Sequence, residues 1–93
     1  MLFLIISNPR PEKPSGAVKA RRQYWKWVDP LVESGVVKSI WARPGRGAVV
    51  VFDVEDHTHL HRLLNEWAEL IPATFDTYPL IDTVAARMHL AKK

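Results

Sequence analysis

The stretch VVKSIWARPGRGAVVVFDV, from Val36 to Val54, decides the fold of this chain. Both of its ends are rich in β-branched and other apolar residues, which are typical of strands. Its centre, RPGRG, contains a proline and two glycines, which favour a turn. We therefore predict a β-hairpin, with strands at residues 36–42 and 48–54 and a connection at residues 43–47.

One strand and one helix are predicted upstream of the hairpin. Met1–Ile6 is apolar on both faces, and the proline-rich stretch at residues 8–16 cannot continue it as a strand. Ser15 is expected to cap a helix that Gly35 stops, with Pro30 kinking or breaking it. The predicted apolar stripe of this helix consists of Val18, Trp25, Val28 and either Leu31 or Val32.

A second helix, a last strand and a C-terminal segment are predicted downstream. Asp56 or Thr58 is expected to open the helix. Its apolar stripe follows the i, i+3, i+4, i+7 template and consists of Leu60, Leu63, Leu64, Trp67, Ala68 and Ile71. Residues 73–81 are predicted to form the last strand, and residues 83–93 a short helix or a tail that docks on a neighbour.

The order βαββαβ predicts an α+β, ferredoxin-like sandwich with a four-stranded antiparallel sheet. Residues 1–93 then form a single domain. Two helices cover one face of such a sheet, yet the strand segments 2–5 and 49–52 are apolar on both faces. We therefore expect a second subunit to cover the other face, sheet against sheet, in a homodimer or a higher homo-oligomer.

The composition is that of an ordinary globular domain, with 47% hydrophobic and 25% charged residues. A net charge of +3 is compatible with an anionic small molecule as partner. The absence of cysteine excludes disulfides and cysteine nucleophiles, and it fits a reducing, cytoplasmic location. The opening MLFLII is too short for a signal peptide or a membrane span, so no membrane partner is expected.

RNA binding is an alternative, because ferredoxin-like sheets also bind RNA and the first helix carries Arg21, Arg22 and Lys26. That function needs exposed aromatic rings on the third strand, where RGAVVVFD has valines. We therefore expect no nucleic-acid partner. The basic helix face is expected to be solvated or to steer an anionic substrate.

Three histidines alternate in the stretch DVEDHTHLHRLL. On a strand they would share one face, as in a metal site. The helical stripe that follows instead puts His57 and His61 on one border and His59 on the other. The usual zinc helix motif adds an adjacent glutamate and a third ligand, and both are missing here, so we expect no metal.

Short motifs follow one another in a characteristic order along nearly the whole chain. They are MLFL, Ser34-Gly35, Ile40-Trp41, Gly45-Arg46, Phe52-Asp53-Val54, Leu60-His61, Pro72 and Pro79-Leu80. This set resembles the muconolactone isomerase family. The resemblance implies an oligomer of the dimeric α/β-barrel type and a cofactor-free 1,3-proton shift in an unsaturated lactone during aromatic breakdown.

The chain departs from that family at three functional positions. Gln23 or Tyr24 stands near the family's glutamate on the first helix. Gly47 and Ala48 stand where the family has tyrosine and asparagine. The departures leave the fold inference intact, whereas the specific lactone isomerase activity does not carry over intact.

Two residues are predicted to be catalytic, His61 and Tyr24. A neutral imidazole at the apolar border of a helix is suited to proton transfer near pH 7, although such a histidine also packs against a sheet and binds a carbonyl. Tyr24 is the second acid–base candidate and is expected to line the pocket. Asp53 ends the third strand, where it either orients a catalytic group and binds substrate or satisfies loop amides.

An apolar pocket for a flat molecule is predicted between the helices and the sheet. Trp27 and Trp41 are expected to line it, whereas Trp25 is expected to be core because it shares the stripe of Val28. Tyr78 and Arg87 are expected to close the pocket or to dock on the partner subunit.

These observations predict a cofactor-free small-molecule isomerase, cyclase or related proton-transfer enzyme that acts on a cyclic or conjugated metabolite. A phosphate-binding loop, a serine nucleophile elbow and a dinucleotide fingerprint are all absent from the sequence. The alternative is a non-catalytic small-molecule-binding or pathway accessory protein on the same scaffold.

Overall fold

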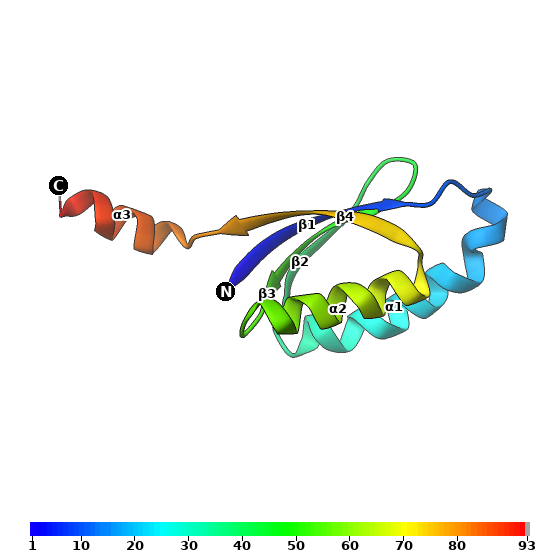
Figure 1. Cartoon of the computed structure of the whole chain (residues 1–93), viewed down its shortest axis with the longest axis horizontal. Helices are drawn as coiled ribbons and strands as arrows, with labels where there is room; N and C mark the ends of the chain where they lie inside the picture. The colour runs from blue at the N-terminus through cyan, green and yellow to red at the C-terminus, as the bar shows by residue number, and fades with distance from the viewer. Residues whose placement is uncertain (93) are drawn as a thin grey trace.

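The computed structural model describes residues 1–92 and has the predicted element order, followed by a C-terminal helix (Figure 1). Its elements are β1 (Leu2–Pro9), a 3₁₀ turn (Pro14–Ala17), α1 (Val18–Glu33), β2 (Val37–Ala42), β3 (Ala48–Asp53), α2 (His57–Leu70), β4 (Ala73–Leu80) and α3 (Thr83–Ala91). The α+β, ferredoxin-like prediction is confirmed.

The sheet has the strand order β2-β3-β1-β4, and every neighbouring pair is antiparallel. Helices α1 and α2 lie side by side on one face of it, as Figure 1 shows. The core lies between these two layers, where Ile5, Val50 and Phe52 from the sheet are fully buried. Val28 of α1 and Leu63 and Trp67 of α2 complete it from the helix side.

The other face of the sheet has no layer over it within residues 1–92 (Figure 1). Side chains that are opposite each other across neighbouring strands share a face. Leu4 is opposite both Val51 and Tyr78, and Val49 is opposite both Ile6 and Trp41. We call these six residues the open face. Its centre is half-buried, while Trp41 and Tyr78 at its sides are exposed.

The start of the chain differs from the prediction. β1 continues to Pro9, because Pro9 pairs with Ala73 at the end of the ladder and Arg10 donates its backbone N–H to the Pro72 carbonyl at 2.9 Å. Ser15 does not cap α1; it lies within the 3₁₀ turn that leads into this helix.

Helix α1 is also rotated relative to the predicted stripe. Tyr24 and Val28 are buried, with Trp27 and Leu31 packed against the core, whereas Val18, Trp25 and Val32 are exposed. The helix is not broken at Pro30 and ends only at Glu33, before Gly35 with φ of 85°. The stop at Gly35 is confirmed, and the core assignment of Trp25 was wrong.

Helix α2 follows its prediction closely. Asp56 caps it by accepting a hydrogen bond from the His59 N–H at 2.8 Å. Leu60, Leu63 and Trp67 of the predicted stripe are buried. The remaining members, Leu64, Ala68 and Ile71, are half-buried.

Helix α3 extends away from the body and has no buried residue (Figure 1). Asp82 caps it through the Val84 N–H at 2.7 Å. It lies beyond the end of β4 that pairs with Leu2, whereas the other end of the sheet holds Ser7 and the β2–β3 connection. None of the helices formed by residues 1–92 is both long and apolar enough to span a membrane.

Candidate functional site

A cleft opens at the end of the sheet where the β2–β3 connection lies. It is bounded by α1, the ends of β1 and β2, this connection, and the last turn of α2. Its lining residues are Ser7, Pro9, Arg21, Tyr24, Trp25, Ile40, Trp41, Ala42, Arg43, Gly45, Arg46, Gly47, Ala48, Trp67 and Ile71. Its volume of about 100 Å³ is on the scale of one six-membered ring, since a cavity of roughly 150 Å³ holds benzene.

Aromatic rings form one wall of this cleft. The ring centroids of Tyr24 and Trp67 are 5.1 Å apart, and those of Tyr24 and Trp25 are 5.6 Å apart with an edge-to-face arrangement. Trp67 is buried, whereas Trp25 is 48% exposed, so the wall runs from the core to the mouth. Such a surface suits a flat ring, which aromatic side chains hold by stacking or edge contacts.

Tyr24 lines the cleft, and its hydroxyl is the unusual polar group of this region. It is buried and has no hydrogen-bond partner within residues 1–92. Burial raises the pKa of this phenol above its ordinary value, because desolvation disfavours the phenolate. The hydroxyl keeps its proton at neutral pH, so it can act as a hydrogen-bond donor. The raised pKa makes it a weaker acid than an ordinary tyrosine, and it is not a base.

Two arginines of the β2–β3 connection are held in place by oxygens of β1 and the residue that follows it. Arg43 Nη1 donates to the Ser7 carbonyl at 2.7 Å and to Asn8 Oδ1 at 3.0 Å. Arg46 Nη1 donates to the Arg10 carbonyl at 2.7 Å. These acceptors are neutral, so both guanidinium groups are held in position without an ion pair.

Close backbone packing supports this arrangement. Gly47 has φ of 104°, and a Cβ atom placed there would lie 2.7 Å from the Ser7 carbonyl oxygen. The Ser7 hydroxyl, itself buried, accepts the Ala48 N–H at 2.8 Å. Glycine at position 47 thus lets β1 approach the connection closely enough for Arg43 to reach Ser7.

Of the seven predicted site residues, the structure brings two to this cleft, Tyr24 and Trp41. His61 and Trp27 instead line a shallow groove on the outer side of the two helices. Trp27 Nε1 donates to Glu66 Oε1 at 2.9 Å, and the exposed His61 ring lies 3.1 Å from Asn65 Nδ2. The two acid–base candidates therefore lie at different places, Tyr24 in the cleft and His61 in the outer groove.

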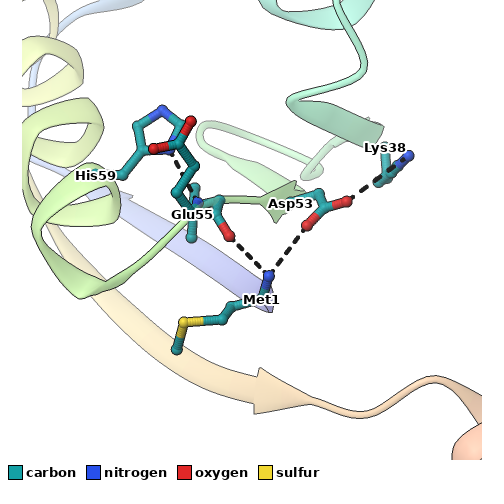
Figure 2. A network of polar contacts seen from close by, with 6 residues as sticks. Met1, Lys38, Asp53, Glu55 and His59 are labelled. Carbon is teal, nitrogen blue, oxygen red and sulfur yellow. Dashed lines mark hydrogen bonds and ion pairs between the residues drawn. The ribbon is translucent and has the colours of Figure 1, made fainter.

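Asp53 belongs to a polar network beside the chain start, shown in Figure 2. Its carboxylate lies 3.2 Å from the Met1 ammonium group and 3.9 Å from Lys38 Nζ. Asp53 is not among the residues that line the cleft. The carboxylate thus contacts two cations, and its predicted role in orienting a catalytic group or binding substrate stays a prediction.

Tyr78 and Arg87 also lie outside the cleft. Tyr78 is exposed on β4, in the open face, and Arg87 is exposed on α3. Their docking on a partner subunit stays a prediction.

The three histidines of α2 have separate surroundings. The His57 ring packs edge-on against Phe3 at 5.6 Å, and His59 Nδ1 accepts the Glu55 N–H at 3.1 Å (Figure 2). His61 is directed at Asn65. Across residues 1–92, no group of three histidine, aspartate or glutamate side chains is arranged to hold a metal ion.

Sequence reasoning missed the three arginines and assigned two tryptophans to the core alone. Arg43 and Arg46 were treated as parts of a turn, and Arg21 as part of a helix face that is solvated or steers an anionic substrate. Trp25 and Trp67 were placed in apolar stripes. The available signal was the pair of arginines flanking Pro44-Gly45, because a turn rarely needs two cations for its own geometry.

Comparison with known proteins agrees with the fold. A family model described as a domain of unknown function (DUF3303) matches residues 1–93. No curated protein matches this sequence.

Among solved structures, the chain is similar to muconolactone isomerase, with a TM-score of 0.68 and 21% identity over 88% of this chain and 90% of that one. It is also similar to 5-chloro-2-hydroxyhydroquinone dehydrochlorinase (TftG) from Burkholderia phenoliruptrix AC1100, solved in complex with 2,5-dihydroxybenzoquinone. That TM-score is 0.65, with 18% identity over 87% of this chain and 94% of that one. The resemblance to muconolactone isomerase is thus confirmed at the level of the fold.

Proposed function

This chain belongs to the DUF3303 family, and we propose that its cleft binds one flat cyclic metabolite and assists proton transfer on it without a cofactor. The observation that carries the proposal is Tyr24, which lines the aromatic cleft and whose buried hydroxyl has no partner of its own within residues 1–92. A buried hydroxyl without a partner costs free energy, about 1–3 kcal/mol. A ligand oxygen in the cleft would supply the missing hydrogen bond.

The chemistry suited to this group is stabilisation of an enol or enolate. In an isomerisation by proton shift, one C–H bond breaks as a water molecule or hydroxide from solvent takes the proton. A new C–H bond forms at another carbon as solvent returns a proton, so the proton count of the substrate is unchanged. Negative charge collects on the conjugated oxygen between the two steps. A protonated tyrosine in a desolvated site donates to that oxygen and lowers the barrier.

The structural relatives support the choice of ligand. Muconolactone is a cyclic compound, and the TftG structure contains 2,5-dihydroxybenzoquinone, a flat ring with conjugated oxygens. A ring of this size matches the aromatic wall formed by Tyr24, Trp25 and Trp67.

A second candidate function is non-catalytic binding of the same kind of ligand. The residues that line the cleft include no carboxylate and no histidine, so within one subunit they supply no base of ordinary strength. His61, predicted as that base, lies in the outer groove. A protein that holds or delivers the metabolite needs the cleft but not the base.

Deuterium incorporation distinguishes the two functions. The wild type, Tyr24→Phe and Tyr78→Phe are each incubated with muconolactone or 2,5-dihydroxybenzoquinone in deuterated buffer and followed by NMR. Catalysis predicts exchange of carbon-bound protons in the wild type and in Tyr78→Phe, and a loss of at least ~100-fold in Tyr24→Phe. Tyr78→Phe is the matched control, because it removes the same hydroxyl from an exposed site.

Saturable binding without exchange in any variant supports the accessory function. If neither compound binds the folded wild type, and if other flat ring compounds also fail, the proposal is rejected. Exchange that persists undiminished in Tyr24→Phe rejects the role of the hydroxyl.

The proposal includes a homodimer formed through the open face. Leu4, Val49 and Val51 are apolar and lie at the centre of this face, beside the exposed Tyr78 and Trp41. A contiguous apolar surface of this kind is characteristic of an interface between subunits. A second copy of the sheet offers the same self-complementary surface.

A further inference from the structure

The cleft carries positive charge that nothing in the described chain neutralises. Three arginines line it, Arg21 from α1 and Arg43 and Arg46 from the β2–β3 connection. The ion pairs formed by residues 1–92 involve the Met1 ammonium and Lys38, and none involves these arginines. Asp76 is linked to Arg43 only through the side-chain amide of Asn8.

The fold does not require this charge. In the fold, Arg43 and Arg46 donate hydrogen bonds to carbonyl and amide oxygens. A neutral donor could satisfy those acceptors equally. Like charges gathered around an apolar cleft repel one another. Such an arrangement is typical of a site whose ligand brings the opposite charge.

The arginines are also prepared for a ligand. Arg43 and Arg46 are held by backbone oxygens on one side, which leaves further N–H donors of each planar fork available. Side chains that are ordered before binding lose less entropy when the ligand arrives. A planar guanidinium group matches carboxylates better than a lysine does, because it donates two parallel hydrogen bonds.

We propose that the ring bound in the cleft carries two negatively charged groups, as an aromatic dicarboxylate does. This inference rests on the proposed function, which places a flat ring against Tyr24 and Trp67. One anionic group would leave two of the three positive charges unbalanced, whereas two groups leave one. The ring then fills the aromatic part, and its charged groups lie at the mouth beside Arg21, Arg43 and Arg46.

Binding of three probes of similar size tests the charge requirement. Phthalate, benzoate and benzamide carry two, one and no negative charges on the same ring, and tryptophan fluorescence or calorimetry reports their binding. We expect phthalate to bind about tenfold or more tighter than benzamide, with benzoate between them.

Two variants test whether the positive charge that attracts the ligand lies in the cleft. Arg21→Gln is expected to weaken phthalate binding by about tenfold and to leave benzamide unchanged. Arg62→Gln removes the same charge from the outer groove on α2, so it controls for long-range attraction. Arg62→Gln should retain wild-type binding of all three probes at moderate salt, where distant charges are screened.

The outcomes separate this inference from the proposed function. Equal binding of phthalate and benzamide overturns the charge inference and leaves ring binding intact. Failure of all three probes with folded protein counts against the proposed function itself. Equal losses in Arg21→Gln and Arg62→Gln, or displacement of phthalate by a short single-stranded RNA, would also overturn the assignment of a small dianion.

Discussion

The two faces of the sheet carry similar side chains but lie in different surroundings. Ile5 and Val50 on the covered face are fully buried, whereas their neighbours Leu4 and Val51 on the open face are only half-buried. The difference comes from α1 and α2, which pack on one face alone (Figure 1). Strand composition therefore shows that both faces avoid water, but helix packing decides which one becomes the core.

The two faces also separate ligand binding from assembly, except at Trp41, which lines the cleft and belongs to the open face. The cleft lies between the covered face and the helices, with Tyr24 and Trp67 in its wall. The open face is the proposed contact between subunits. A substitution on one face should therefore affect stability and ligand binding, and a substitution on the other should affect assembly.

The largest effect is expected from Trp67→Ala on the covered side. Trp67 is 2% exposed and packs against Tyr24 and Phe75, with ring centroids 5.1 and 5.0 Å away. Its removal leaves a cavity and should lower the free energy of unfolding by about 3–5 kcal/mol, measured by urea denaturation. Trp41→Ala is the matched control, because Trp41 is 69% exposed and should cost less than ~1 kcal/mol in the monomer.

An intermediate effect is expected from Val51→Lys at the centre of the open face. A lysine there places a charge inside the proposed interface, so dimerisation should weaken at least ~100-fold while the monomer stays folded. Sedimentation or light scattering across a concentration series measures it. Val32→Lys makes the same exchange at an exposed position of α1 and should leave the oligomer unchanged. A monomeric wild type would remove the basis for an assembly through this face.

The smallest effect is expected in the pH dependence of the free energy of unfolding, through Tyr24 in the cleft. Burial raises the pKa of Tyr24 in the folded protein above the value of about 10 expected in the unfolded chain. The stabilisation of the folded state that comes from keeping Tyr24 protonated is therefore fully present below about pH 10. As the pH rises above that value, the free energy of unfolding falls by at most ~1.4 kcal/mol per pH unit. Urea denaturation across this range should show the loss in Tyr78→Phe and not in Tyr24→Phe.

Tyrosinate absorbance gives a second reading of the same group. Tyr24 is the only tyrosine left in Tyr78→Phe, because the chain has two. Its ionisation should therefore appear only well above pH ~10, or together with unfolding. Ionisation near pH 10 in the folded variant would show that the hydroxyl is not buried as described.

Elements whose signals are local were predictable from the sequence. The hairpin at residues 36–54 and helix α2 with its Asp56 cap agree with the structure, because turn residues, caps and long regular stripes act over a few positions. The buried face of helix α1 was harder to predict. Apolar residues fill more than one side of it, so periodicity alone did not show that Tyr24 rather than Trp25 faces the core.

The candidate site depended on contacts between distant segments. Arg43 reaches Ser7 across 36 positions of sequence, and Gly47 is needed because β1 passes close to it. His61 and Tyr24 were the first and second choices for an acid–base group in the cleft, and the helices direct them to different sites. No local pattern contains this information.

The sequence by itself determined the order of strands and helices, the apolar character of both sheet faces, and the absence of cysteine chemistry. The tertiary structure alone decided that Tyr24 loses its hydrogen-bond partners and that three arginines from two segments share one cleft. The reason is physical. Periodicity and turn propensity are properties of neighbouring residues, whereas desolvation and charge density depend on which distant segments pack together.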